Sequence, residues 1–437
     1  MEKRIESEKI DNIILLFIYT LVGLLKWFPI LQTIGMIVVI LGICYFSLKQ
    51  ELHKLAPLFI FFNSSILYFN GIAICDLFFV LYILSYLRGK RFLNKKHMHP
   101  MLLVFSIYAI TVMASYDLLL GMEVLLSLVF CFLFLNDMLK RKLWMQFCDW
   151  YIIGILTATI YGIKIYIDSS INLLEGESFR YILTFTDPNY AGMFLSIGLY
   201  MLILLKNEFG VVKRYLGIAV CIVSILLTMS SSAIFCNVVV VVMLIFSKGL
   251  RNINLKLILK SSCMIIIFLF VFLGVIINYF PSAKRSLERF GEKVEFLKEG
   301  DLGNATTERS DLWNKHLDYF WNQENPIKIL IGGNYLTDKG FDKRHFSVVS
   351  HEVYIDSLIC FGCLGTMCYI VTVLHQLYNK WRKRKISPNH TLIFVISLIW
   401  TIYSFILSMF PFWAFVFFLF VDIKEEDSKI ANKEFNT

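Results

Sequence analysis

Two short segments in the last third of the chain combine residue types that could bind an anion and move a proton. Arg309 is followed by Trp313, and His351 is followed directly by Glu352 and then by Tyr354. A guanidinium presents a planar fork of N–H donors that matches the oxygens of phosphate or pyrophosphate. An imidazole titrates near neutral pH and can accept a proton from an attacking hydroxyl. These residues predict a group-transfer site with His351, Glu352 and Arg309 as its catalytic groups.

Both segments also have a purely structural interpretation. Arg309 could pair with Glu308 or Asp311 on a solvated surface, since exposed ion pairs are common and weak. A lone histidine where a loop meets a membrane helix is more often an interfacial residue with one hydrogen bond. The residue types alone leave both interpretations open.

A second arginine lies in an earlier polar segment, 168–187. Arg180 stands between Phe179 and Tyr181, and Asp187-Pro188-Asn189 follows where an apolar stretch begins. The amides at the start of a helix favour an anion, so Arg180 and Asn189 could help to hold a pyrophosphate. The alternative is an ordinary helix cap made by Asp187.

The largest polar interruption of the chain is 281–350. Residues 283–299 have apolar side chains at helical spacing and predict an amphipathic helix that carries Arg285 and Arg289. A second helix is predicted over 307–322. After it Pro326 breaks the chain, and Gly332-Gly333-Asn334 forms a tight turn.

The elements that must position these residues are membrane helices. Apolar residues make up 57% of the chain and charged residues 17%, against roughly 45–50% and 25% in soluble domains. The composition predicts an all-α, polytopic membrane bundle of about fourteen spans, with about twelve as the alternative count. The fourteen-span count requires 55–87 and 101–136 each to fold as a hairpin of two short helices.

The chain divides into four regions by composition. We expect an N-terminal membrane bundle of about eleven spans, a large outer loop with amphipathic helices that carries the active site, a region of C-terminal transmembrane helices and a cytoplasmic tail. Their respective boundaries are 1–280, 281–350, 351–422 and 423–437.

The distribution of basic residues along the chain agrees with this division into membrane and loop regions. The net charge is +9, and the basic residues cluster in short connections such as 88–96, 140–142 and 380–385, which the positive-inside rule assigns to the cytoplasm. Both termini are then cytoplasmic, and 168–187 and 281–350 lie outside. This distribution favours contact with membrane lipids and argues against nucleic acid as a partner.

The cysteines predict neither a disulfide framework nor a metal site. All ten lie in or beside apolar stretches. Cys360 and Cys363 have the spacing of a redox or zinc motif, but no second ligand pair accompanies them, so they are interpreted as small packing residues.

The layout of these residues resembles the bacterial O-antigen and capsular polysaccharide polymerases (Wzy type) and the related O-antigen ligases. Members of these families have many spans, a Pro-Asn entry to a middle helix, and a late outer loop. That loop carries an Arg…Trp element, a Gly-rich turn and a His before the next helix. The matching positions here are Pro188-Asn189, Arg309 with Trp313, Gly332-Gly333 and His351.

The resemblance implies a glycosyltransferase on the outer face of the bacterial cytoplasmic membrane. Such an enzyme transfers a glycan from undecaprenyl pyrophosphate to a hydroxyl of another lipid-linked oligosaccharide, without a metal or other cofactor. Arg180 and Arg309 would hold the pyrophosphate, while His351 and Glu352 would assist the acceptor hydroxyl. The other substrate contacts that the resemblance implies are Arg285, Arg289, Asn189, Trp313, Asn334 and Tyr354. A flippase and a chain-length regulator are the expected protein partners.

The chain departs from the family at one position, and other functions stay open. Many relatives have a Ser-Arg pair where a middle span turns outside, whereas this chain has Ser230-Ser231-Ser232-Ala233. An O-antigen ligase would use the same residues with a different acceptor. A flippase, another transporter or a non-catalytic assembly protein would not need them.

Overall fold

The computed structural model is almost entirely helical. It describes residues 2–62, 66–69, 72–89, 118–171, 180–248, 288, 291–292, 295–296, 298–300, 309–323, 325–332, 350–407 and 413–423. The helices in this part of the chain are α1 (Glu2–Leu24), α2 (Leu31–Leu48), α3 (Ala56–Phe61), α4 (Ile74–Arg88), α6 (Leu118–Arg141), α7 (Trp144–Ile171), α8 (Pro188–Leu204), α9 (Val211–Leu227), α10 (Ser231–Lys248), α14 (Arg309–Trp321), α15 (Pro326–Ile331), α16 (Val353–Lys383), α17 (Pro388–Ser404) and α18 (Trp413–Phe420). A 3-10 turn, Leu52–Lys54, and one antiparallel pair, β1 (Tyr68–Phe69) with β2 (Ile72–Ala73), complete the described elements. The predicted all-α class is confirmed.

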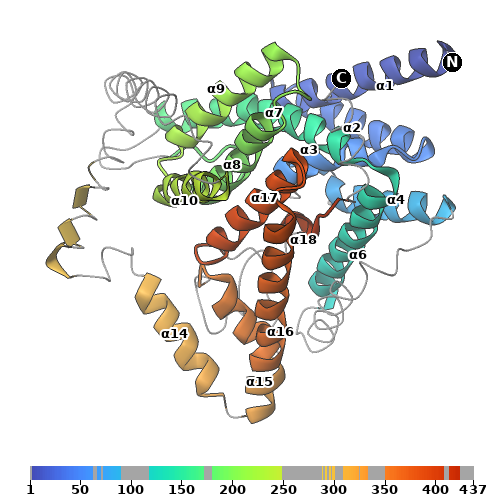
Figure 1. Ribbon diagram of the computed structural model, residues 1–437. Helices are drawn as coiled ribbons and strands as arrows, with labels where there is room; N and C mark the ends of the chain where they lie inside the picture. The colour runs from blue at the N-terminus through green and yellow to red at the C-terminus, as the bar shows by residue number, and fades with distance from the viewer. Residues whose placement is uncertain are drawn as a thin grey trace.

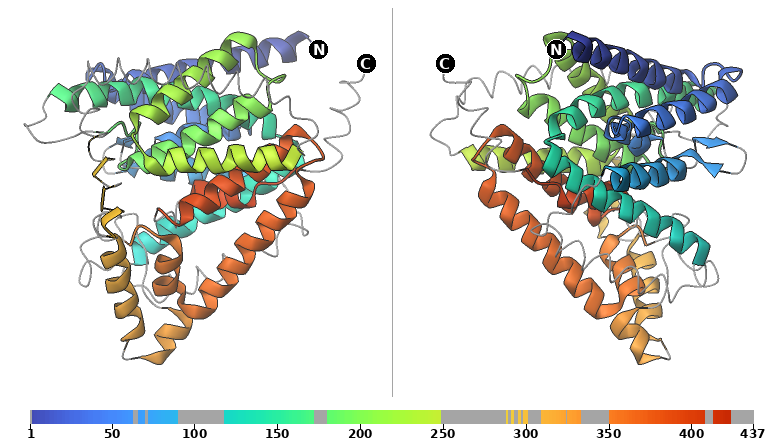
Figure 2. Two further views of the ribbon diagram at one scale, coloured as in Figure 1. Left: turned by 60° about the vertical axis from the view of Figure 1, so that its left-hand side comes forward. Right: turned by 90° about the vertical axis from the view of Figure 1, so that its right-hand side faces the viewer.

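Helix α17 is the common neighbour of two groups of helices. In Figures 1 and 2 the helices from α1 to α10 form the larger bundle, and α14, α15 and α16 extend from one side of it. α17 packs against α8 and α10 in the larger bundle, and also against α16 and α18. The starts of α14 and α16, which carry the predicted site, are therefore placed by contacts with α17.

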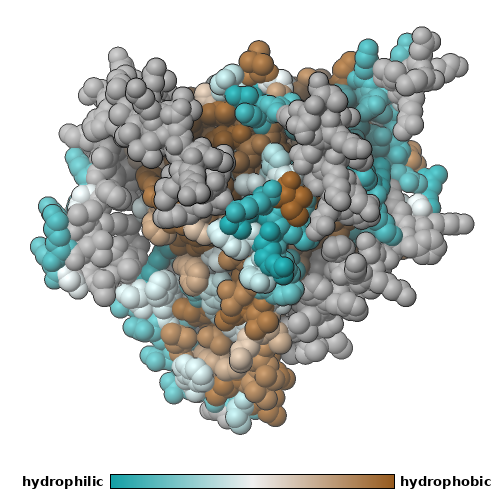
Figure 3. Space-filling model, viewed as in Figure 1, coloured by the Kyte–Doolittle hydropathy of each residue, from teal (hydrophilic) through white to brown (hydrophobic). Residues whose placement is uncertain are grey.

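Three described helices are long and apolar enough to cross a membrane. They are Leu31–Leu48, Trp144–Ser169 and Val353–Lys383, and two shorter apolar helices are Pro188–Leu204 and Ser231–Leu244. Figure 3 shows apolar side chains gathered over the lower face formed by α15 and α16. The protein is thus a membrane protein, while these helices do not confirm a count of about fourteen spans.

Residues 55–87 do not form the predicted hairpin of two membrane helices. α3 ends after 6 residues at Phe61, and the chain then passes through β1 and β2 before α4 begins. A six-residue helix is about 9 Å long, far short of the ~30 Å hydrocarbon core of a bilayer. The second predicted hairpin, 101–136, lies partly outside the described residues.

Residues 281–350 contain one of their two predicted helices in the part of the chain that the structure describes. α14 (Arg309–Trp321) confirms the helix predicted over 307–322. Pro326 begins α15 instead of only interrupting the chain, because the Asn325 side chain accepts a hydrogen bond from the Ile327 amide at 3.0 Å. Proline is tolerated at this first helical position, where the amide has no partner within the helix. The helix predicted over 283–299 lies largely outside the described residues.

α16 is broken at Gly362, and the end of α15 presses against the break. Gly362 has non-helical backbone angles, φ 63° and ψ −172°. A Cβ added to Gly332 would lie 2.1 Å from the Cys360 carbonyl oxygen, and one added to Gly362 would lie 2.5 Å from the Gly332 nitrogen. Both glycines have positive φ, which costs little only without a side chain. The close contact between Gly332 and Gly362 fixes where residues 325–332 cross α16.

The C-terminal helices are held by a buried lysine. The Lys380 ammonium donates to the Leu419 carbonyl at 2.6 Å and to the Ser397 hydroxyl at 2.7 Å. A cation is favourable beside the last carbonyls of a helix, which carry partial negative charge. Lys380 therefore joins α16 to α17 and to the end of α18.

We predict that Gly332→Ala and Gly362→Ala each destabilise the protein. Overpacking costs roughly 1–3 kcal/mol, and the positive φ with ψ of about 180°, a conformation that is essentially confined to glycine, adds roughly 1–3 kcal/mol for a residue with a Cβ. Thermal unfolding of the purified protein in detergent should show a clear loss for both variants. Gly210→Ala is the control, because a Cβ there meets nothing within 4 Å. Equal stability of all three variants would contradict the close contact.

Candidate functional site

Arg309 begins α14 and reaches the end of α17. Its Nη1 donates to the Ile406 carbonyl at 3.1 Å, just beyond the last residue of α17. The terminal carbonyls of a helix lack partners within the helix and attract cations. Within the described residues, neither Asp311 nor any other carboxylate forms a salt bridge with Arg309. Asp311 is therefore not the ion-pair partner of Arg309, and Glu308, the other candidate, lies outside the described residues.

Residues 350–352 form the turn that leads into α16. The Glu352 carboxylate caps the helix by accepting a hydrogen bond from the Ile355 amide at 2.6 Å. Trp313, one turn after Arg309 on α14, donates its indole N–H to the Ser350 carbonyl at 3.0 Å. This bond ties α14 to the turn and places His351 where the two helices meet.

The turn is held from within by a serine and an aspartate. The Ser350 hydroxyl donates to the Asp356 carboxylate at 2.5 Å and accepts from the Glu352 amide at 3.1 Å. All three residues are buried. The turn is thereby locked to the first turns of α16.

His351 adopts an unusual backbone conformation in this turn. Its φ is 57°, in the left-handed region that few residues other than glycine occupy. Such strain persists only where the surroundings enforce it, and it is concentrated at functional sites. The bonds made by Ser350 and Trp313 supply that enforcement.

The start of α8 already has a carboxylate partner. The Asp187 side chain accepts a hydrogen bond from the Asn189 amide at 2.7 Å, so the interpretation as a helix cap is confirmed. The Ser230 hydroxyl donates to the Asn189 side-chain oxygen at 2.6 Å and accepts from the Ala233 amide at 3.1 Å. Asn189 is buried, and it joins the starts of α8 and α10.

Arg180 secures the end of α9. Its Nε donates to the Thr228 carbonyl at 3.0 Å, and its Nη2 donates to the Met229 carbonyl at 3.1 Å. Both carbonyls follow Leu227, the last residue of α9. Because Ser230 comes next in the chain, Arg180 belongs to the same polar region as Asn189.

Asp187, Arg309, His351 and Glu352 together form what we call the junction site. Burial lowers the pKa of His351, and the positive charges of Arg309 and His316 lower it further, while Asp187 opposes them. Burial also lowers the pKa of Arg309, again opposed by Asp187. The charges of Asp187, Arg309 and His316 thus all act on the pKa of His351. His351 is consequently neutral at pH 7 and able to accept a proton.

Glu352 is the second titratable group beside His351. Burial raises the pKa of its carboxyl to about 7, and the nearby Asp356 charge contributes in the same direction. Hydrogen bonds from the Ile355 and Tyr354 amides act in the opposite direction. Glu352 therefore changes protonation near neutral pH, which is the range useful for proton transfer.

The structure gathers some of the predicted site residues and separates others. Four of them, Arg309, Trp313, His351 and Glu352, lie at the meeting of α14 and α16. Arg180 and Asn189 lie around the turn between α9 and α10, and Asp187 links that region to the junction site. Tyr354 contacts α17, where its hydroxyl lies 3.2 Å from that of Ser404. Arg285, Arg289 and Asn334 lie outside the described residues.

His316 is a further residue of α14 near the junction site, and it is not among the site residues predicted from the sequence. It is buried, and its Nδ1–H donates to the Leu312 carbonyl at 2.6 Å. The available signal was spacing: Arg309, Trp313 and His316 stand at i, i+4 and i+7 and share one helix face.

Known proteins do not add to this picture. No protein-family model matches the sequence, and a search of curated proteins finds no match.

The left-handed conformation of His351 predicts a difference between two substitutions. Asn tolerates this region and Val does not, so His351→Val should be less stable than His351→Asn by about 1 kcal/mol. Chemical unfolding in detergent measures the difference. A more stable Val variant would show that residue 351 has an ordinary backbone conformation.

Glu352 predicts a pH dependence of stability with a defined sign. Its pKa is about 7 in the folded protein, above the ordinary value of 4.5, so the folded state binds more protons between these pH values. This carboxyl therefore makes the free energy of unfolding fall as pH rises from about 4.5 to about 7, by up to about 3 kcal/mol.

Glu352→Gln should lack this contribution, because glutamine does not titrate. The free energies of unfolding of wild type and variant are compared at several pH values. His351, whose lowered pKa makes stability rise with pH below 6.5, is present in both proteins, so its contribution cancels in the difference. We expect the variant to gain stability relative to wild type as pH rises. A difference that does not change with pH would contradict the raised pKa.

Proposed function

We propose that the protein is a membrane glycosyltransferase that polymerises lipid-linked oligosaccharide repeat units. The donor is a glycan on undecaprenyl pyrophosphate, and the acceptor is a hydroxyl of another lipid-linked unit. The product is an O-antigen, capsular polysaccharide or exopolysaccharide. We place the reaction on the outer face of the cytoplasmic membrane, with both termini in the cytoplasm, because of the positions of the basic loops.

The observation that carries this proposal is the proximity of Arg309 and His351. Arg309 begins α14 and binds the end of α17, and His351 stands in the turn before α16 that Trp313, one helical turn after Arg309, holds through Ser350. Glycosyl transfer from a pyrophosphate requires these two functions: stabilisation of a leaving anion and acceptance of a proton. The electrostatic stabilisation of the leaving anion is stronger in a buried site than in water.

The reaction breaks one bond and forms another at the anomeric carbon of the donor sugar. The bond from this carbon to the pyrophosphate oxygen breaks, and the leaving group takes the electron pair. The acceptor oxygen forms the new bond, and its proton passes to the imidazole of His351. Arg309 offsets the negative charge that develops on the pyrophosphate.

Arg180 is given a supporting role in this mechanism. Two of its N–H donors hold the end of α9, so its replacement should also loosen the turn that contacts Asn189. The burial of a cation beside helix-end carbonyls is a structural function in its own right. Arg309 and His351 are therefore the more direct test of chemistry.

We expect Arg309→Ala and His351→Ala to abolish long polymer in cells that lack the native gene. Each variant is compared with wild type for the length distribution of the surface polysaccharide and for its level in the membrane. Removal of one group that acts in the transition state costs about 100-fold or more in rate. Single lipid-linked repeat units should accumulate on the outer face.

Arg309→Lys and Lys206→Ala are the matched controls. Lysine keeps the charge but not the planar fork, so Arg309→Lys should retain only part of the activity. Lys206 is exposed in the turn between α8 and α9, and its replacement should leave the polymer unchanged. Normal polymer from both alanine variants would refute the proposed site. Repeat units trapped on the inner face in the null strain would indicate a flippase, and transfer of finished polymer to another acceptor would indicate a ligase.

A further inference from the structure

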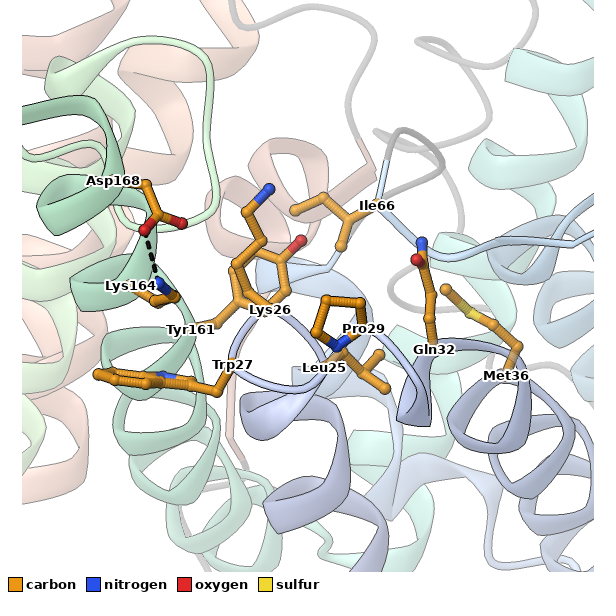
Figure 4. A pocket seen from close by; sticks show the side chains of 10 residues that line it. All are labelled: Leu25, Lys26, Trp27, Pro29, Gln32, Met36, Ile66, Tyr161, Lys164 and Asp168. Carbon is orange, nitrogen blue, oxygen red and sulfur yellow. Dashed lines mark hydrogen bonds and ion pairs between the residues drawn. The ribbon is translucent and has the colours of Figure 1, made fainter. Parts of the chain in front are cut away.

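A cavity of about 410 Å³ lies between the turn that joins α1 to α2 and the second half of α7. Its volume is within the usual range for small-molecule sites, roughly 300–1,000 Å³. Figure 4 shows its lining, which includes Lys26, Trp27 and Gln32 from the turn and α2, and Tyr161 and Lys164 from α7. None of these residues belongs to the junction site.

The cavity lies at the level of a membrane surface. Gln32 and Met36 stand in the first turns of α2, while Tyr161, Lys164 and Asp168 stand in the last turns of the membrane-length part of α7. The start of α2 and the end of α7 line the same cavity, so both helix ends mark the same side of the bilayer. Trp27 and Tyr161 are residue types enriched at this boundary.

The cavity has a polar mouth and an apolar wall. Leu25 and Met36 are buried in its wall, and Ile66 completes it. Trp27 is fixed in place because its indole N–H donates to the Ile160 carbonyl at 2.8 Å and the Lys164 ammonium lies 5.7 Å from the centre of its ring. A ligand that fits both parts has a polar head and an apolar tail.

The charges in the cavity leave one cation unmatched. Lys164 forms an ion pair with Asp168 at 2.6 Å, as Figure 4 shows. Lys26 is exposed, and among the described residues no carboxylate pairs with it. The charged lining residues are Lys26, Lys164 and Asp168, so the cavity carries a net positive charge.

We propose that this cavity binds the phosphate group of a lipid, with Lys26 as the cation that contacts the phosphate. An ammonium is a point charge that binds phosphate without demanding a fixed geometry. Gln32 supplies amide donors beside it, and the wall formed by Leu25, Met36 and Ile66 contacts the first part of the lipid chain. The inference does not depend on the proposed glycosyl transfer, since it concerns binding at a separate place.

The phosphate could belong to a membrane phospholipid or to a polyprenyl carrier, and the test separates these sources. The purified full-length protein in detergent is titrated with dioctanoyl phosphatidylglycerol, with a short polyprenyl monophosphate and with dioctanoylglycerol, which lacks phosphate. Dissociation constants are measured by thermophoresis. We expect at least one phosphate-bearing probe to bind more tightly than dioctanoylglycerol, and the tighter of the two identifies the source.

Lys26→Glu should weaken binding of that probe by about tenfold or more, because the attraction between the Lys26 ammonium and the phosphate is replaced by repulsion between a carboxylate and the phosphate. Lys206→Glu makes the same change of charge at an exposed site in the turn between α8 and α9 and should bind like wild type. Thermal unfolding checks that both variants fold. Equal binding of dioctanoylglycerol, or equal loss in the two variants, would overturn the proposal.

Discussion

The bond from the Arg309 guanidinium to the carbonyl of Ile406 is the constraint on which the junction site depends. A partly buried cation is costly unless polar groups compensate for its lost hydration. The end of α17 supplies carbonyl dipoles, and Asp187 at the start of α8 supplies a negative charge. Arg309 thereby joins the start of α14 to the end of α17, and the bond from Trp313 to Ser350 brings His351 to the same end of α14.

Two rigid contacts keep this meeting point in position. On the outer segment, Gly332 and Gly362 allow the backbone of α15 to touch the break in α16. On the opposite side of α17, Lys380 holds the end of α18. Both contacts hold α16, and the bonds made by Ser350 and Trp313 join the turn that carries His351 to this helix and to α14.

Arg180 and Arg309 both donate hydrogen bonds to carbonyls at helix ends. The same donors that stabilise a helix end are suited to bind an anion. Carbonyl oxygens at a helix end and the oxygens of a pyrophosphate offer the same kind of acceptor to a guanidinium. Arg180 contacts the carbonyls of Thr228 and Met229, whereas Arg309 contacts one carbonyl. A guanidinium has five N–H donors, so these contacts leave Arg309 with donors that a substrate can engage.

The sequence by itself determined the helical class, the membrane setting, the start of α8 and the approximate boundaries of α14. These depend on local composition, caps and periodicity, and Asp187 and Pro188 mark a helix start in any fold. It also pointed to Arg309, Trp313, His351 and Glu352 as residues of one site. Only the tertiary structure decided that Arg180 binds a helix end, that His316 joins the site and that 55–87 is no helical hairpin. Those outcomes depend on contacts between residues far apart in the chain, such as Arg309 with Ile406, and no local pattern encodes them.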